Sequence, residues 1–236
     1  MRYVGLLLLL CAAGCAPVGN VVTDAPAPKR LMVWDDLLSR PKPAADMTVR
    51  YGADALQVVD VWKPAGAGPH PAVVMIHGGC WQTEIAERDI MNWIADDLRT
   101  HGVGVWNIEY RGVDRGGGYP GTYQDVGAAA DMFAAKRAEY GFKTDAPVVT
   151  IGHSAGGHLA AMLLTCQWPQ WAPDLPADLV KNALSISGLF ELESIRHTPF
   201  LKEALQLTPA QVLRLSPAWL PQPRGRLFAV AGAEES

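Results

Sequence analysis

The chain has 236 residues, of which 49% are hydrophobic, and a formal net charge of −4 at pH 7. This composition is typical of one globular domain with a large core, and the absence of a basic block argues against a nucleic-acid-binding protein. Its six histidines are scattered along the sequence and do not cluster beside paired cysteines, so we expect no metal site and no cofactor.

Residues 1–14 are typical of a secretory signal peptide, because Arg2 precedes an apolar run too short to span a bilayer comfortably. The run ends in Ala-Ala-Gly-Cys at 12–15, which resembles a bacterial lipoprotein signal with Cys15 as the lipid attachment site. No acidic residue follows Cys15, so this resemblance implies an exported protein anchored to the outer membrane on its periplasmic side. The alternative is an ordinary signal cleaved nearby, for example after Ala16.

Residues 15–45 are rich in proline and alanine, which indicates a tether, with one short helical piece at 31–38. Residues 46–236 then alternate between two patterns. Strands are expected at 56–62, 72–77, 103–110, 147–152, 182–188 and 226–232, and helices at 87–102, 122–141 and 155–166. This alternation predicts an α/β fold with a mostly parallel sheet and helices on both faces. The segments 166–181 and 189–223, rich in proline and tryptophan, are expected to form a small cap outside the core.

The strand at 147–152 runs into the following helix through Gly152-His153-Ser154-Ala155-Gly156. A sharp turn from strand to helix crowds the positions around its central residue, so its neighbours must be small. The pattern is therefore interpreted as a nucleophile elbow that exposes the Ser154 hydroxyl at the C-terminal edge of the sheet. The alternative is a small-residue turn that serves only packing.

A second motif, His-Gly-Gly-Cys-Trp at 77–81, ends the buried strand at 72–77. Acyl transfer needs N–H groups aimed at the developing oxyanion, and the expected donors are Gly78, Gly79 and Ala155. Trp81 is expected to form a wall of a small acyl pocket, with core packing as the alternative. A plain β-turn is the alternative for the two glycines.

The histidines near these motifs are expected to be structural. His77 ends a strand and is expected to hydrogen-bond the loop backbone, His153 is expected to pack under the elbow, and His158 to lie in the core. Cys80 and Cys166 are expected to be unpaired, because they belong to different ends of the helix at 155–166.

Together, "HGGCW", "EYRG", "GHSAGGHLAA", "ISGLFELE" and "VAGAEES" resemble the arylformamidase-like esterases, α/β-hydrolases related to kynurenine formamidase and to hormone-sensitive-lipase-type carboxylesterases. The resemblance covers about residues 50–236. It implies the α/β-hydrolase fold and a triad in the chain order serine, acid, histidine. The acid maps onto Glu235, with Glu234 as the near alternative and Glu191 as a third candidate. Alternatively, Glu234 and Glu235 belong to a solvated tail and have no catalytic role.

The histidine implied by the family should follow the acid after one more strand and helix, whereas the sequence ends at Ser236. We therefore expect the chain to be a fragment, with a truncated gene product as the alternative. His197 belongs to the cap segment and is not expected to replace the missing base.

The expected function is hydrolysis of a small acyl ester by a serine carboxylesterase through an acyl-enzyme on Ser154. Arylformamidase activity on N-formylkynurenine is the alternative within enzymes, although the export signal speaks against a cytoplasmic catabolic role. A non-catalytic or truncated hydrolase-fold lipoprotein is the third possibility.

The anchor can be tested directly. Lipidation of Cys15 predicts that the protein incorporates labelled palmitate and fractionates with membranes, and that Cys15→Ser abolishes both, because the thiol is the acceptor of the lipid. A periplasmic protein that is soluble and carries an unlipidated N-terminus would contradict the assignment.

Overall fold

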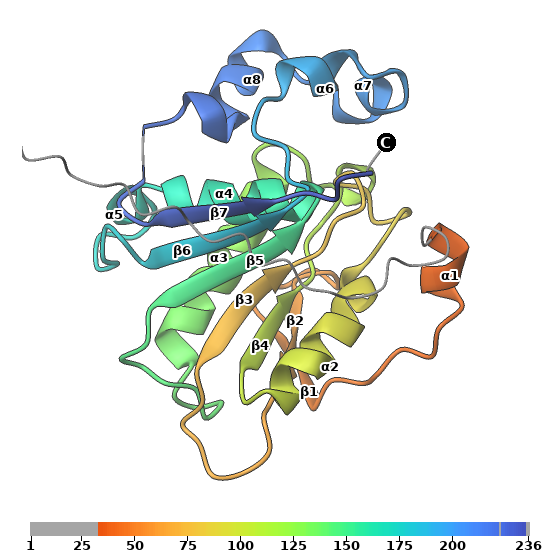
Figure 1. Cartoon of the computed structure of the whole chain (residues 1–236). Helices are drawn as coiled ribbons and strands as arrows, with labels where there is room; N and C mark the ends of the chain where they lie inside the picture. The colour runs from red at the N-terminus through yellow and green to blue at the C-terminus, as the bar shows by residue number, and fades with distance from the viewer. Residues whose placement is uncertain (1–32, 222, 235–236) are drawn as a thin grey trace, which may run out of the picture.

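The computed structural model describes residues 33–221 and 223–234, and within them a seven-stranded sheet occupies the centre of the domain (Figure 1). The strand order is β1-β2-β4-β3-β5-β6-β7. The strands are β1 (Met47–Arg50), β2 (Val58–Trp62), β3 (Ala72–Ile76), β4 (Gly104–Ile108), β5 (Val148–His153), β6 (Val180–Ile186) and β7 (Arg226–Val230). The pairs β1–β2 and β2–β4 are antiparallel, and every pairing from β4 to β7 is parallel. The mostly parallel sheet predicted from the alternation is confirmed.

Helices cover both faces of this sheet, as expected. On one face, α3 (Gly121–Lys136) and α4 (Ala155–Thr165) pack on a cluster that includes Trp106, and on the other, α2 (Asn92–Thr100) packs on a cluster that includes Met75. The strands between the two layers are buried throughout or at their C-terminal ends, and their side chains are mostly apolar, with Asp60 on β2 and Asn107 on β4 as buried polar exceptions.

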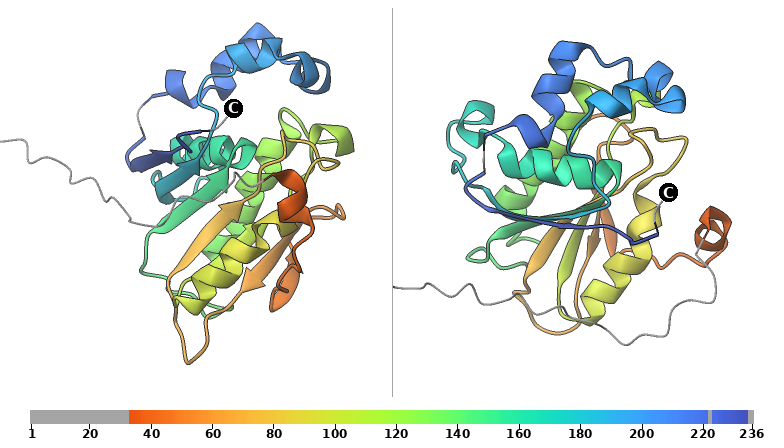
Figure 2. Two further views of the ribbon diagram at one scale, coloured as in Figure 1. Left: turned by 45° about the vertical axis from the view of Figure 1, so that its right-hand side comes forward. Right: turned by 45° about the horizontal axis from the view of Figure 1, so that its top comes forward.

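The segment between β6 and β7 forms the predicted cap, defined here as residues 189–219. Its helices are α6 (Glu193–His197), α7 (Pro199–Leu205) and α8 (Pro209–Leu215), followed by the single turn η3 (Pro217–Trp219). Figures 1 and 2 show α6, α7 and α8 together at one end of the molecule, above the end of the sheet at which the parallel strands finish. Buried Leu192, Leu201 and Leu215 attach the cap to the domain.

The segment at 166–181 differs from the expectation that it lies outside the core. It contains the short helix α5 (Trp168–Trp171), in which the Trp168 side chain is 1% exposed and belongs to the main hydrophobic cluster. The prediction was wrong here because proline-rich composition describes the backbone and not the burial of one large side chain.

Several element boundaries also differ from the prediction. β1 was not predicted, because its side chains are mostly exposed and lack the apolar pattern of a core strand. The predicted helix at 122–141 ends at Lys136, and the one at 87–102 begins as a 3₁₀ turn, η1 (Arg88–Met91).

Part of the predicted tether is packed on the domain. A short helix, α1 (Trp34–Leu38), lies within it, and the carbonyls of Pro41 and Pro43 accept hydrogen bonds from the Trp93 indole and the Asn92 amide, each at 2.9 Å. The last residues of the tether are therefore fixed to the start of α2.

The signal peptide predicted at 1–14 and the attachment site at Cys15 lie outside the described residues. Within the described ranges, Cys80 and Cys166 are unpaired, as expected. No helix in the same ranges is long and apolar enough to cross a bilayer.

In the described part of the sheet, β7 is an edge strand that pairs with β6 on one side. All five of its residues are exposed, with Phe228 at 52% and Val230 at 51%. An exposed, apolar edge strand is a template for pairing with another chain.

We therefore expect the 236-residue polypeptide to self-associate as its concentration rises. Phe228→Lys should weaken this association, because a charged side chain opposes edge-to-edge pairing. Sedimentation velocity over a range of concentrations measures the effect. Leu213→Lys is the matched control, since Leu213 is 61% exposed but lies on α8. Equal association of wild type and both variants would rule out the edge strand as the contact.

Candidate active site

Ser154 lies between the end of β5 and the start of α4, in a conformation that non-glycine residues rarely adopt. Its backbone angles are φ 53° and ψ −119°. Two backbone hydrogen bonds fix this conformation, because Ser154 N–H donates to the Ile186 carbonyl at 2.8 Å and its own carbonyl accepts from His158 N–H at 3.0 Å. A strained residue held by its surroundings is the structural property of a nucleophile elbow. Among the described residues, no hydrogen bond uses its hydroxyl.

The helix after Ser154 approaches the sheet too closely for a side chain at Gly156. A Cβ at this position would lie 2.1 Å from the Ile76 carbonyl oxygen and 2.4 Å from that of His77. A Cβ at Gly152 would lie 2.2 Å from the Gly156 carbonyl oxygen. Both neighbours are backbone atoms, so neither position accepts even alanine without a shift of the strand or the helix.

The loop after β3 lies directly against the elbow. A Cβ at Gly78 would lie 3.3 Å from the Ser154 Cβ, so the Gly-Gly turn and the nucleophile are in contact. Gly79 has φ 104°, which favours glycine. No hydrogen bond among the described residues uses the N–H of Gly78, Gly79 or Ala155. Gly78 is in contact with Ser154, and Ala155 follows it directly in the chain, so two of the three expected donors belong to residues beside the serine.

His77 has the structural role expected of it. Its Nδ1 lies 2.7 Å from the Gly78 carbonyl oxygen, and its Nε2 lies 2.8 Å from Oε1 of Glu109. The ring is buried and stacks on Tyr110 with centroids 4.3 Å apart. Both ring nitrogens are occupied, so the geometry does not present His77 as a base for Ser154.

His158 is a core residue, as expected. Its Nε2 donates to the Leu215 carbonyl at 2.7 Å, which links α4 to the end of cap helix α8. The rings of Trp81 and Tyr123 meet it edge to face, with centroids 5.2 Å and 5.8 Å away. Burial lowers the pKa of His158 to about 4, although the bond to Leu215 opposes the shift.

Two further histidines remain. His153 does not pack under the elbow, as had been expected, but is exposed, because the turn at Ser154 directs it away from the core. His197 belongs to the cap, as expected, where it ends helix α6 and its Nε2 lies 3.1 Å from Glu193.

The three candidate acids fall in different places. Glu235 lies outside the described residues, and Glu234 is exposed in the turn after β7. The carboxylate of Glu191 accepts from the backbone N–H groups of Glu193 and Ser194, so it caps the start of α6.

A small pocket lies between Trp81, the start of α3 and the cap. Trp81 lines this pocket and also belongs to the main hydrophobic cluster, with 3% of its surface exposed. The lining is aromatic and aliphatic, with no charged side chain: Trp81, Val113, Gly118, Tyr119, Thr122, Tyr123, Leu192, Leu205, Leu207 and Leu215. This lining suits an uncharged, apolar group, and none of Gly78, Gly79 and Ser154 belongs to it.

The charged residues behind the oxyanion loop were not anticipated from the sequence. Glu109 at the end of β4 is fully buried between His77 and Arg88. Asp114 accepts from the N–H groups of Thr83 and Glu84, each at 2.9 Å, and holds the far end of the same loop. In the sequence, the position of Glu109 directly after an apolar strand is the one sign of a buried carboxylate. Its partners cannot be identified from the sequence, because they lie more than 20 residues away.

Comparison with known proteins agrees with this architecture. Residues 59–172 match the BD-FAE family model. The chain is 30% identical over 173 residues to a kynurenine formamidase from Danio rerio, which covers 73% of this chain and 55% of that protein. It is 27% identical to esterase LipC from Mycobacterium tuberculosis, over 75% of this chain and 44% of that protein. The chain thus spans about half the length of the curated relatives it matches.

Among solved structures, native esterase 2 from Thermogutta terrifontis superposes with a TM-score of 0.61 at 19% identity, over 80% of this chain and 81% of that one. This similarity establishes the α/β-hydrolase fold. The resemblance to the arylformamidase-like and hormone-sensitive-lipase-type esterases is confirmed, and together the relatives support a hydrolase.

The buried, neutral His158 predicts a pH dependence of stability. Its pKa is about 4 in the folded chain against 6.5 in a model peptide, so the unfolded chain binds more protons between these values. The free energy of unfolding should therefore fall as pH drops from 6.5 to 4, by on the order of 3 kcal/mol from this residue. Urea denaturation at several pH values measures it. His158→Gln should flatten this part of the profile, whereas His101→Gln, at an exposed site, should not. Identical profiles for wild type and His158→Gln would exclude His158 as the cause.

Proposed function

We propose that this chain, which has the α/β-hydrolase fold and resembles the arylformamidase-like esterases, is a serine carboxylesterase that hydrolyses a small acyl ester. The observation that carries the proposal is the contact between the strained Ser154 and Gly78, together with the N–H groups of Gly78, Gly79 and Ala155, which make no hydrogen bond within the part of the chain that the structure describes. A serine that serves only packing has no need of such donors.

The reaction follows from this geometry. The Ser154 oxygen attacks the ester carbonyl carbon, its proton passes to a base, and the carbonyl oxygen becomes an oxyanion. The N–H groups of Gly78, Gly79 and Ala155 stabilise that charge, and removal of one such donor typically costs about 10²–10³ in kcat. The C–O bond to the alcohol then breaks with a proton returned to the leaving oxygen, and water hydrolyses the acyl-enzyme.

The acid that supports the base is assigned to Glu235, with Glu234 as its near alternative. Glu191 is a weaker candidate because its carboxylate already caps α6. His77, His158 and His197 each bind another group, so none of these three is assigned as the base. The family resemblance implies a histidine that follows the acid in chain order.

The substrate class follows from the cavity. Its lining carries no charged side chain and includes Trp81, Tyr119 and Tyr123, which supports an ester whose acyl or alcohol group is uncharged and apolar. No cofactor or metal is needed for this chemistry, and the proposed partners are the small-molecule ester and, through Cys15, the membrane. The proposed location is the periplasmic side of the outer membrane.

Arylformamidase activity is the second candidate, favoured by the 30% identity to the Danio rerio kynurenine formamidase. The same serine and oxyanion donors would attack a formamide carbonyl, and the aromatic cavity would hold an aryl ring. Comparison of kcat/KM for N-formylkynurenine and for p-nitrophenyl acetate separates the two functions.

The full-length protein should hydrolyse p-nitrophenyl acetate, and Ser154→Ala should lower kcat by about 10⁶-fold, because the nucleophile is removed. Ser39→Ala, at an exposed site after α1, is the control and should leave kcat unchanged. Activity of Ser154→Ala within tenfold of wild type would refute the nucleophile.

The polypeptide 1–236 should show at most residual turnover, about 10³–10⁴ over water, from the oxyanion donors alone. Robust turnover by purified, monomeric 1–236 would instead mean that its base is among the described histidines, and His197→Ala would be the first variant to measure. Inactivity of the full-length protein toward both substrates would favour a non-catalytic hydrolase-fold lipoprotein.

A further inference from the structure

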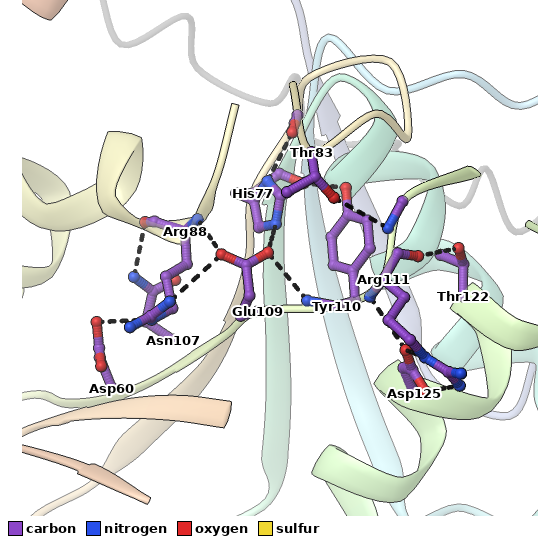
Figure 3. Close-up of polar contacts among 12 residues, drawn as sticks. Asp60, His77, Thr83, Arg88, Asn107, Glu109, Tyr110, Arg111, Thr122 and Asp125 are labelled. Atoms are coloured by element: carbon purple, nitrogen blue, oxygen red, sulfur yellow. Dashed lines mark hydrogen bonds and ion pairs between the residues drawn. The ribbon is translucent and has the colours of Figure 1, made fainter. Parts of the chain in front are cut away.

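Four charged side chains lie in a row behind the oxyanion loop (Figure 3). Nε2 of His77 is 2.8 Å from Oε1 of Glu109, whose Oε2 is 3.4 Å from Nη1 of Arg88, and Nε of Arg88 is 2.8 Å from Oδ2 of Asp60. The side chains of His77 and Glu109 are 2% and 0% exposed. Buried ion pairs add little net stability compared with apolar residues of similar size. Stability alone therefore does not explain why these four side chains are present.

Donors and acceptors fix the charge of His77. Nδ1 faces a carbonyl oxygen, that of Gly78, and must carry a proton to bind it. Nε2 faces a Glu109 oxygen that also accepts from Tyr110 N–H at 3.1 Å. The other Glu109 oxygen accepts from Arg88 N–H at 2.9 Å. The Arg88 side chain also donates to this oxygen at 3.4 Å, so three N–H donors other than His77 favour the carboxylate form of Glu109. A carboxylate only accepts hydrogen bonds, so Nε2 of His77 donates to it and both ring nitrogens carry protons.

The same contacts fix two consecutive peptide planes. The hydroxyl of Tyr110 donates to the His77 carbonyl at 3.1 Å, and Nδ1 of His77 donates to the Gly78 carbonyl at 2.7 Å. In a trans peptide the N–H of the next residue points opposite to the carbonyl. Binding these two carbonyls behind the loop therefore orients the N–H groups of Gly78 and Gly79 to the other side, which is the side without an internal acceptor.

We propose that His77, kept as an imidazolium by Glu109, is a positioning residue that orients the Gly78 and Gly79 N–H groups for the oxyanion. The proposal rests on the esterase function proposed above. Glu109 fixes the protonation state of the ring, Tyr110 holds the preceding carbonyl, and Arg88 with Asp60 balances the buried charge. His77 acts through the glycine backbone and touches no reacting atom.

The activity test uses two double variants with the same neutral charge. His77→Leu alone would leave the Glu109 carboxylate buried without its partner, which destabilises the fold for an unrelated reason. His77→Asn/Glu109→Gln places an amide donor where Nδ1 lies, whereas His77→Leu/Glu109→Gln has no donor there. In the full-length protein, the leucine pair should lower kcat by about 10²–10³ with KM little changed, and the asparagine pair should recover most of this loss. Circular dichroism and thermal unfolding of both verify that they fold. Equal kcat values for two folded pairs would overturn the proposal, as would a change confined to KM.

A second readout does not depend on catalysis. Proton–nitrogen correlation spectra of the ¹⁵N-histidine-labelled protein at pH 7 should show both ring nitrogens of His77 protonated, identified by the loss of its signals in the asparagine pair. A singly protonated ring would overturn the imidazolium. If Ser154→Ala retained full activity while His77 were doubly protonated, the esterase function would fail and the charge assignment would remain.

Discussion

The contact between the first turn of α4 and the end of β3 is the constraint on which the site depends. Gly156 lies against the carbonyls of Ile76 and His77, and Gly78 lies against Ser154. These approaches are shorter than any side chain allows, so the helix that follows Ser154 and the loop that contains Gly78 and Gly79 are positioned by the same backbone contact. The strain at Ser154 is maintained because β6 and α4 both hydrogen-bond its peptide groups.

Polar residues behind this contact connect it to the other side of the sheet. His77, Glu109, Arg88 and Asp60 contact one another in that order. Asp60 also accepts a hydrogen bond from Thr48 on β1. The antiparallel strands β1 and β2 are thus linked to the loop after β3 through side chains as well as through the backbone ladder from β2 through β4 to β3. An apolar replacement of this row would pack at least as well, but it would leave the Gly78 carbonyl without a donor.

Much of the architecture was readable from the sequence because it depends on local patterns. Apolar runs predicted the parallel strands, and the small residues around Ser154 predicted an elbow that the backbone angles confirm. The exposed strand β1 has no such pattern. The burial of Trp168 depends on tertiary packing, which the composition of its segment does not describe. His153 was misplaced because the direction of a side chain at a strained turn does not follow strand alternation. Glu109 was missed because His77 and Arg88 lie 32 and 21 residues away, and only the fold brings them together.

The cap has a closed base. Leu192 N–H donates to the Ser216 hydroxyl at 2.9 Å, and Ala218 N–H donates to the Phe190 carbonyl at 2.9 Å. The chain therefore leaves the sheet after β6 and returns toward β7 at almost the same place. These two hydrogen bonds form the neck of the cap, and the cap helices lie beyond it. Such a cap can gain, lose or exchange helices over evolutionary time while the neck keeps β6 and β7 in register. Substrate preference can in this way diverge among homologues whose catalytic frame stays constant.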